Sequence, residues 1–97
     1  MSDHEIAAGR GARAQGLLDN PLLAESFKAL EDAYSAAWRS TRIDDVAGRE
    51  KLFLAINIVG KVRDHLTQVA SDGKLAAAEL RRLAETAERK REWHEVP

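Results

Sequence analysis

The spacing of apolar residues in the middle of this chain of 97 residues constrains its fold more than any other feature. Between residues 52 and 69 apolar residues recur at steps of three and four, close to the heptad seam of a coiled coil. They are Leu52, Ile56, Val59, Val62, Leu66 and Val69. A similar series precedes them and comprises Leu22, Leu23, Phe27, Leu30, Tyr34, Ala37 and Trp38. Because this spacing puts apolar side chains on one face of an α-helix, it predicts an all-α protein with two long amphipathic helices.

The limits of the first long helix follow from its capping residues. Asn20 is a preferred N-cap and Pro21 suits the first helical position, so a helix is expected to start at residue 21 and end near residue 40. Asp44 or Asp45 can cap the next helix. The connection 42–45 is short enough to make the two helices antiparallel, which predicts a small helical bundle built on a helical hairpin.

Glycines suggest where the later helices end. The segment 71–73 is expected to end the second long helix, with Gly73 in a left-handed conformation, and a further helix is expected from about Leu75. Gly60 lies in the middle of a helix, where it marks either a close approach of another helix or simple tolerance of glycine. The prediction is therefore three main helices plus an N-terminal arm or short helix.

The N-terminal segment is less regular than the rest. Gly9, Gly11 and Gly16 each cost a helix about 1 kcal/mol relative to alanine, and apolar residues are few. Residues 1–18 are therefore expected to form either a frayed helix or an arm that orders against a partner. The expected organisation is this segment, a helical domain over 19–88, and a charged C-terminal tail over 89–97.

The residue types argue against an enzyme. The chain has no cysteine, which excludes disulfides and cysteine-based zinc or redox sites. His4, His65 and His94 have no metal-ligand spacing, and no serine lies in a nucleophile motif. No glycine-rich phosphate loop is present. We therefore expect no catalytic residue, no cofactor and no metal.

Charge and aromatic residues instead indicate contacts with a partner. The net charge is −1, but residues 1–48 carry −3 and residues 49–97 carry +2. A lone tryptophan in a charged tail, Trp93, is a candidate anchor into a partner's pocket, whereas Trp38 continues an apolar stripe and is expected in the core. The predicted partner-binding residues are Leu22, Phe53, Arg81, Arg82, Arg89, Arg91 and Trp93.

The order of several motifs resembles that of small uncharacterised helical proteins of tailed bacteriophages and proteobacterial prophages. The resemblance covers roughly residues 15 to 83. Its motifs are Asn20-Pro21-Leu22-Leu23, Ala37-Trp38-Arg39-Ser40-Thr41, Gly48-Arg49-Glu50-Lys51-Leu52, Lys61-Val62-Arg63-Asp64-His65-Leu66 and Gly73-Lys74-Leu75. It implies a phage virion or assembly component and assigns no catalytic residues.

The expected function is therefore a non-enzymatic interaction or assembly protein, a phage virion or morphogenesis component. The expected partner is another protein or further copies of the chain, because a core of two or three helices is thin. The alternative is a small nucleic-acid-binding packaging or regulatory factor, and an inhibitor of a host enzyme is a weaker option. No run of residues is long and apolar enough for a membrane span. The expected location is the cytoplasm of a bacterial host, with incorporation into a virion as a further option.

Overall fold

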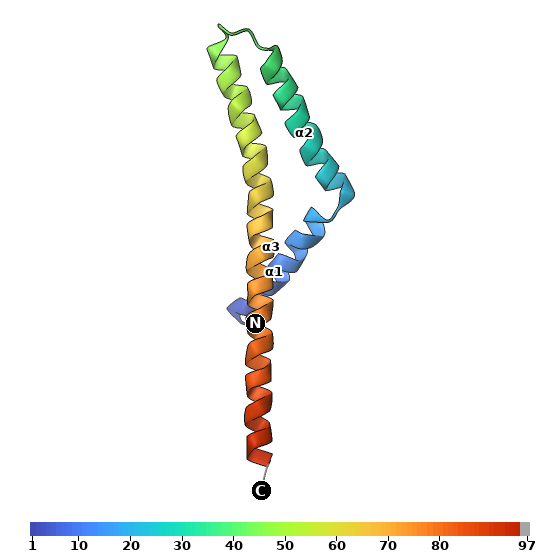
Figure 1. The fold of residues 1–97 in the computed structure, drawn as a ribbon, viewed down its shortest axis with the longest axis vertical. Coiled ribbons are helices and arrows are strands. Elements are labelled where there is room, and N and C mark those ends of the chain that lie inside the picture. The colour runs from blue at the N-terminus through green and yellow to red at the C-terminus, as the bar shows by residue number, and fades with distance from the viewer. Residues whose placement is uncertain (96–97) are drawn as a thin grey trace.

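The computed structural model describes the backbone of residues 1–95 and the side chains of residues 1–92. Three helices follow one another: α1 (Asp3–Leu18), α2 (Pro21–Ser40) and α3 (Val46–Glu95) (Figure 1). The described residues contain no strand, so the predicted all-α class is confirmed. The molecule measures 83 × 24 × 18 Å and its radius of gyration is 22.1 Å. A compact domain of this length would have a radius of gyration of about 12.5 Å, so the fold is strongly elongated.

Side-chain caps set where the helices begin. Asn20 Oδ1 accepts hydrogen bonds from the backbone N–H groups of Leu22 (2.9 Å) and Leu23 (3.2 Å), which confirms the predicted start of α2. Asp45 Oδ1 accepts from the N–H of Gly48 at 3.1 Å, so Asp45 rather than Asp44 caps α3. These bonds satisfy N–H groups that have no partner within the helix.

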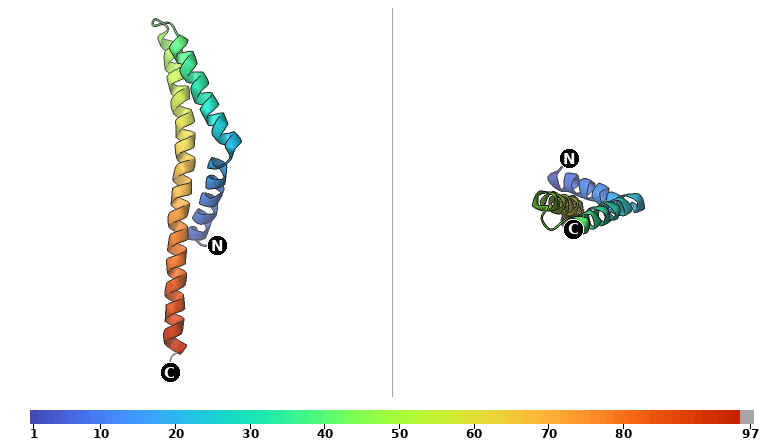
Figure 2. Two further views of the ribbon diagram at one scale, coloured as in Figure 1. Left: turned by 45° about the vertical axis from the view of Figure 1, so that its right-hand side comes forward. Right: turned by 90° about the horizontal axis from the view of Figure 1, so that it is seen from above.

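α2 and α3 form the predicted helical hairpin, and α1 packs on it in an elongated arrangement. α2 packs antiparallel to the first part of α3 and α1 packs across its middle, whereas α1 and α2 make few contacts with each other (Figure 2). Beyond the start of α1, the last turns of α3 extend alone (Figure 1). Each stretch of α3 therefore has at most one helix packed along it.

The predicted helix end at Gly73 is wrong, and so is the separate helix from Leu75. α3 passes through Gly73 without interruption, and no glycine in the described residues has a positive φ. Two causes favour continuation over a break. The residues after Gly73 are mostly strong helix formers. In addition, Gly73 lies beneath α1, and α1 packs against the helical backbone at this position.

The N-terminal segment forms a full helix because it packs on α3. Ser2 caps it by accepting a hydrogen bond from the N–H of Glu5 at 3.1 Å. Gly11 faces Gly73 so closely that a Cβ on either glycine would overlap the Cα of the other. By contrast, a Cβ on Gly60 would meet nothing within 4 Å, so Gly60 is simply tolerated. The helix crossing is instead marked by Gly11 and Gly73.

The core is thin and made of small side chains. Among the described residues the buried apolar side chains are Ala14, Ala70 and Ala76, and no large side chain is fully buried. Trp38 was predicted in the core and is instead more than one-third exposed. Two packed helices cannot surround a large side chain on all sides, so the apolar stripes are only half-buried. No helix in the described part of the chain combines the length and hydropathy of a membrane span.

Candidate interaction surface

Two arginines of α3 hold α2 in place. The Arg63 guanidinium forms an ion pair with Glu31 across the interface, with 3.0 Å between Nη1 and Oε1, and lies 5.3 Å from the centroid of the Phe27 ring. Arg49 stacks on the Trp38 ring at 4.4 Å and donates a hydrogen bond of 2.9 Å to Thr41 Oγ1. A guanidinium over an aromatic face is attracted by the negative charge of that face. These polar and cation–π contacts therefore add to the small apolar contact between α2 and α3.

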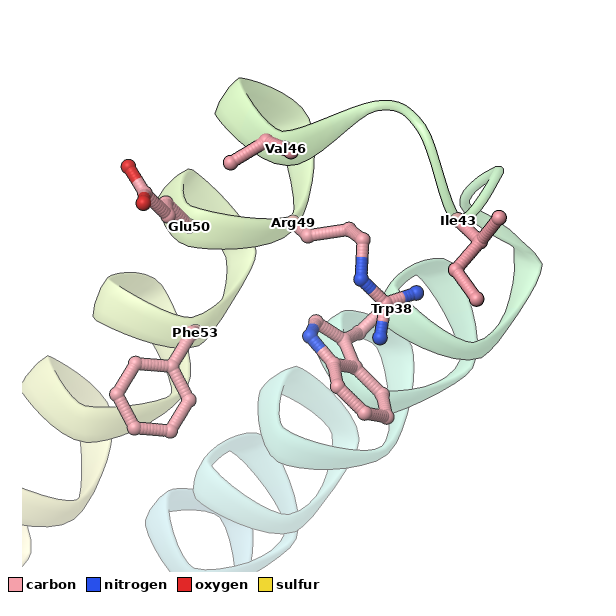
Figure 3. Close-up of a pocket in the computed structure, with 6 residues that line it drawn as sticks. All are labelled: Trp38, Ile43, Val46, Arg49, Glu50 and Phe53. Carbon is pink, nitrogen blue, oxygen red and sulfur yellow. The ribbon is translucent and has the colours of Figure 1, made fainter.

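The contact between Arg49 and Trp38 borders an apolar pocket, which lies where the loop joins α2 to α3. We call it the tip pocket. Its volume is about 320 Å³ and it opens widely to solvent. Its lining residues are Trp38, Ile43, Val46, Arg49, Glu50 and Phe53 (Figure 3). Figure 3 shows Arg49 reaching from α3 over Trp38, whereas the Glu50 carboxylate points away from Trp38. The pocket can therefore accept an apolar side chain, with one acidic group at its edge.

A second apolar surface lies on α3, on a side of the helix that α2 does not cover. Leu54, Ile58 and Val62 follow one another at four-residue steps and are 59%, 60% and 48% exposed. We call these three residues the 54–62 row. The side chains that face α2 are different ones, including Leu52 and Ile56, which are half-buried. Such contiguous exposed apolar surface is typical of a contact site in a soluble protein.

The shifted pKa values in the described residues come from ion pairs within single helices. A hydrogen bond from Arg82 and its positive charge lower the pKa of Glu79, and the same hydrogen bond raises the pKa of Arg82. The hydrogen bond with Asp32 raises the pKa of Lys28. Lys28 and Arg82 are exposed, and Glu79 is partly exposed. The described residues contain no group of three or more histidine, aspartate or glutamate side chains that could hold a metal ion.

The structure does not bring the predicted partner-binding residues together. Phe53 lines the tip pocket, and Leu22 is exposed in the first turn of α2, away from the pocket. The four arginines lie on the C-terminal turns of α3: Arg81, Arg82, Arg89 and Arg91. Arg82 pairs with Glu79 and Arg91 pairs with Glu88. Trp93 lies within α3, but its side chain is outside the described residues.

Most residues of the tip pocket were not predicted from the sequence. Ile43 is 91% exposed in a loop of charged residues, and Val46 begins the next helix. An isoleucine between Arg42 and Asp44 was the available signal, because loops of this kind are usually polar throughout. Arg49 left no such signal, because its stacking partner Trp38 lies on another helix.

Comparison with known proteins adds nothing to this geometry: no family model, curated protein or solved structure matches the chain.

Proposed function

We propose that this chain is a non-enzymatic interaction or assembly protein that binds a partner protein through the tip pocket. The observation that carries the proposal is the apolar pocket between Trp38, Ile43 and Phe53 at one end of the elongated molecule. A role as a phage virion or morphogenesis component, acting in the host cytoplasm or within the particle, rests on the sequence resemblance and belongs to the same proposal.

The chemistry of the pocket supports a protein partner. Exposed aromatic and aliphatic groups around a concave surface gain most by taking up an apolar side chain, and such pockets carry much of the binding energy of interfaces. The stacking of Arg49 on Trp38 holds the pocket wall in place before binding. A wall that is already ordered loses less conformational entropy when the partner binds.

The alternative, binding of nucleic acid through the basic end of α3, has less support. Two of the four arginines there are paired with glutamates of the same helix, Glu79 and Glu88. Each such pair leaves less positive charge for contacts with phosphates.

Photocrosslinking from the tip tests the proposal. A photoreactive phenylalanine analogue replaces Ile43, and the cells or particles that contain the chain are irradiated. We expect adducts of discrete mass with a protein, and we expect Phe53→Ser to reduce them at least about tenfold by removing one pocket wall.

Leu75→Ser is the matched control. Leu75 is 71% exposed on the same helix and does not line the tip pocket. Adducts that persist in Phe53→Ser, or that fall equally in both variants, would contradict the proposal. Crosslinks to nucleic acid with none to protein would replace it with the alternative.

A further inference from the structure

The chain exposes more surface than a stable monomer of its size. Its solvent-accessible area is 7697 Å² for a mass of 10.7 kDa. A compact monomer of this mass exposes about 5,500 Å², so the excess is about 2,200 Å². Each subunit of a permanent homodimer buries about 1,000–2,500 Å². The excess therefore has the size of one subunit's share of a dimer interface.

The 54–62 row lies on one flank of α3. Beyond the row this flank carries His65, Val69, Asp72 and Ala76, at alternating steps of three and four residues. His65 and Asp72 are exposed and polar, whereas Val69 is half-buried beside α1 and Ala76 is buried. This seven-residue period keeps a set of side chains on one side of two helices that wind around each other. The flank thus has the spacing of a coiled-coil seam, and the 54–62 row supplies its exposed apolar side chains.

We propose that a second copy of this chain docks on this flank of α3 in antiparallel orientation, with the two-fold axis near Val62. This inference rests on the proposed function, because it names one partner of the interaction protein. In the antiparallel dimer, the segment of α3 on which α2 packs lies beside the segment of the partner's α3 on which α1 packs. Four helices would then surround a shared core, which is the arrangement of a four-helix bundle.

The orientation follows from charge. Lys51 lies eleven residues before Val62 and Asp72 lies ten residues after it, and both side chains are exposed. In the antiparallel dimer, Lys51 of each copy lies opposite the partner's Asp72. A parallel dimer would instead set lysine against lysine and aspartate against aspartate, which is unfavourable.

Light scattering over a dilution series, together with sedimentation equilibrium, tests for the dimer. We expect twice the mass of the 10.7 kDa chain. Ile58→Glu is expected to weaken dimerisation more than about a hundredfold, because each dimer would then bury two unpaired carboxylates. Asn57→Glu adds the same charge one residue earlier, on a side chain that points away from the flank, and is expected to leave dimerisation unchanged.

Cysteine crosslinking tests the orientation, since the chain has no cysteine of its own. Chains with Lys51→Cys are mixed with chains carrying Asp72→Cys and oxidised. The antiparallel dimer yields the mixed disulfide in excess over either homodisulfide. Circular dichroism of each variant checks that its helix content is retained.

A monomer at every concentration, a dimer insensitive to Ile58→Glu, or an excess of homodisulfides would each overturn the inference. A monomeric chain would leave the tip-pocket proposal standing, because photocrosslinking from position 43 decides that question separately.

Discussion

Gly11 of α1 and Gly73 of α3 lie in backbone-to-backbone contact where the two helices cross. A Cβ on Gly11 would overlap the Gly73 Cα and approach the Val69 carbonyl oxygen to 3.0 Å. A Cβ on Gly73 would approach the Ala7 carbonyl oxygen to 3.0 Å. Neither obstacle is a flexible side chain, so any larger residue must move one helix away from the other.

Gly73→Ala is therefore expected to lower the free energy of unfolding by about 1–3 kcal/mol, through overpacking at the crossing. Gly60→Ala is the control, because a Cβ there meets nothing within 4 Å. Its gain in helix propensity is expected to raise the free energy of unfolding by up to about 1 kcal/mol. Urea unfolding followed by circular dichroism, at one protein concentration, measures both. Equal stabilisation by the two substitutions would show that the helices do not cross here.

Arg63→Ala is expected to destabilise the chain by about 1–2 kcal/mol, because it removes the ion pair with Glu31 and the stacking on Phe27. A double-mutant cycle with Glu31→Gln separates the ion pair from the stacking. Arg91→Ala breaks a pair within one exposed helix turn and is expected to change little. If Arg63→Ala were as mild as Arg91→Ala, α2 would not depend on this contact.

Asn20→Ala is expected to cost about 1 kcal/mol, because the N–H groups of Leu22 and Leu23 lose their acceptor. For a domain of this size that loss corresponds to a fall in Tm of about 4–8 °C. Asn20→Ser keeps an acceptor oxygen and is expected to retain most of the stability. Thermal unfolding of the three proteins measures the difference, and identical Tm values would refute the cap.

The pKa of Glu79 lies below its ordinary value of 4.5, because Arg82 donates a hydrogen bond to the carboxylate and adds a positive charge beside it. The stability from this pair is present above pH 4.5 and is lost as the pH falls through the lowered pKa. Carboxyl NMR titration is expected to show the midpoint rise in Arg82→Gln. Arg81→Gln, which removes a neighbouring charge that does not pair with Glu79, should leave it unchanged. An equal rise in both variants would mean that general charge, not the pair, lowers the pKa.

Local signals were enough for the helix class and for two of the helix starts. Asn20 and Asp45 act through backbone groups two or three residues away, so their effect can be inferred from the adjacent sequence. Phe53, predicted as a partner-binding residue, is 59% exposed and lies outside the apolar stripe of its helix. The tip pocket could not be found in this way, because Trp38 and Arg49 meet only when the hairpin closes.

The sequence by itself determined that the chain is helical, where α2 and α3 begin, and that its core would be thin. Only the tertiary structure decided that α3 runs unbroken through Gly73 and that the glycine-rich N-terminal segment is a helix. The physical reason is the same for both. Gly11 and Gly73 weaken their own helices when each is considered alone, yet their missing side chains let two backbones touch, and that contact exists only once residues 62 positions apart have met.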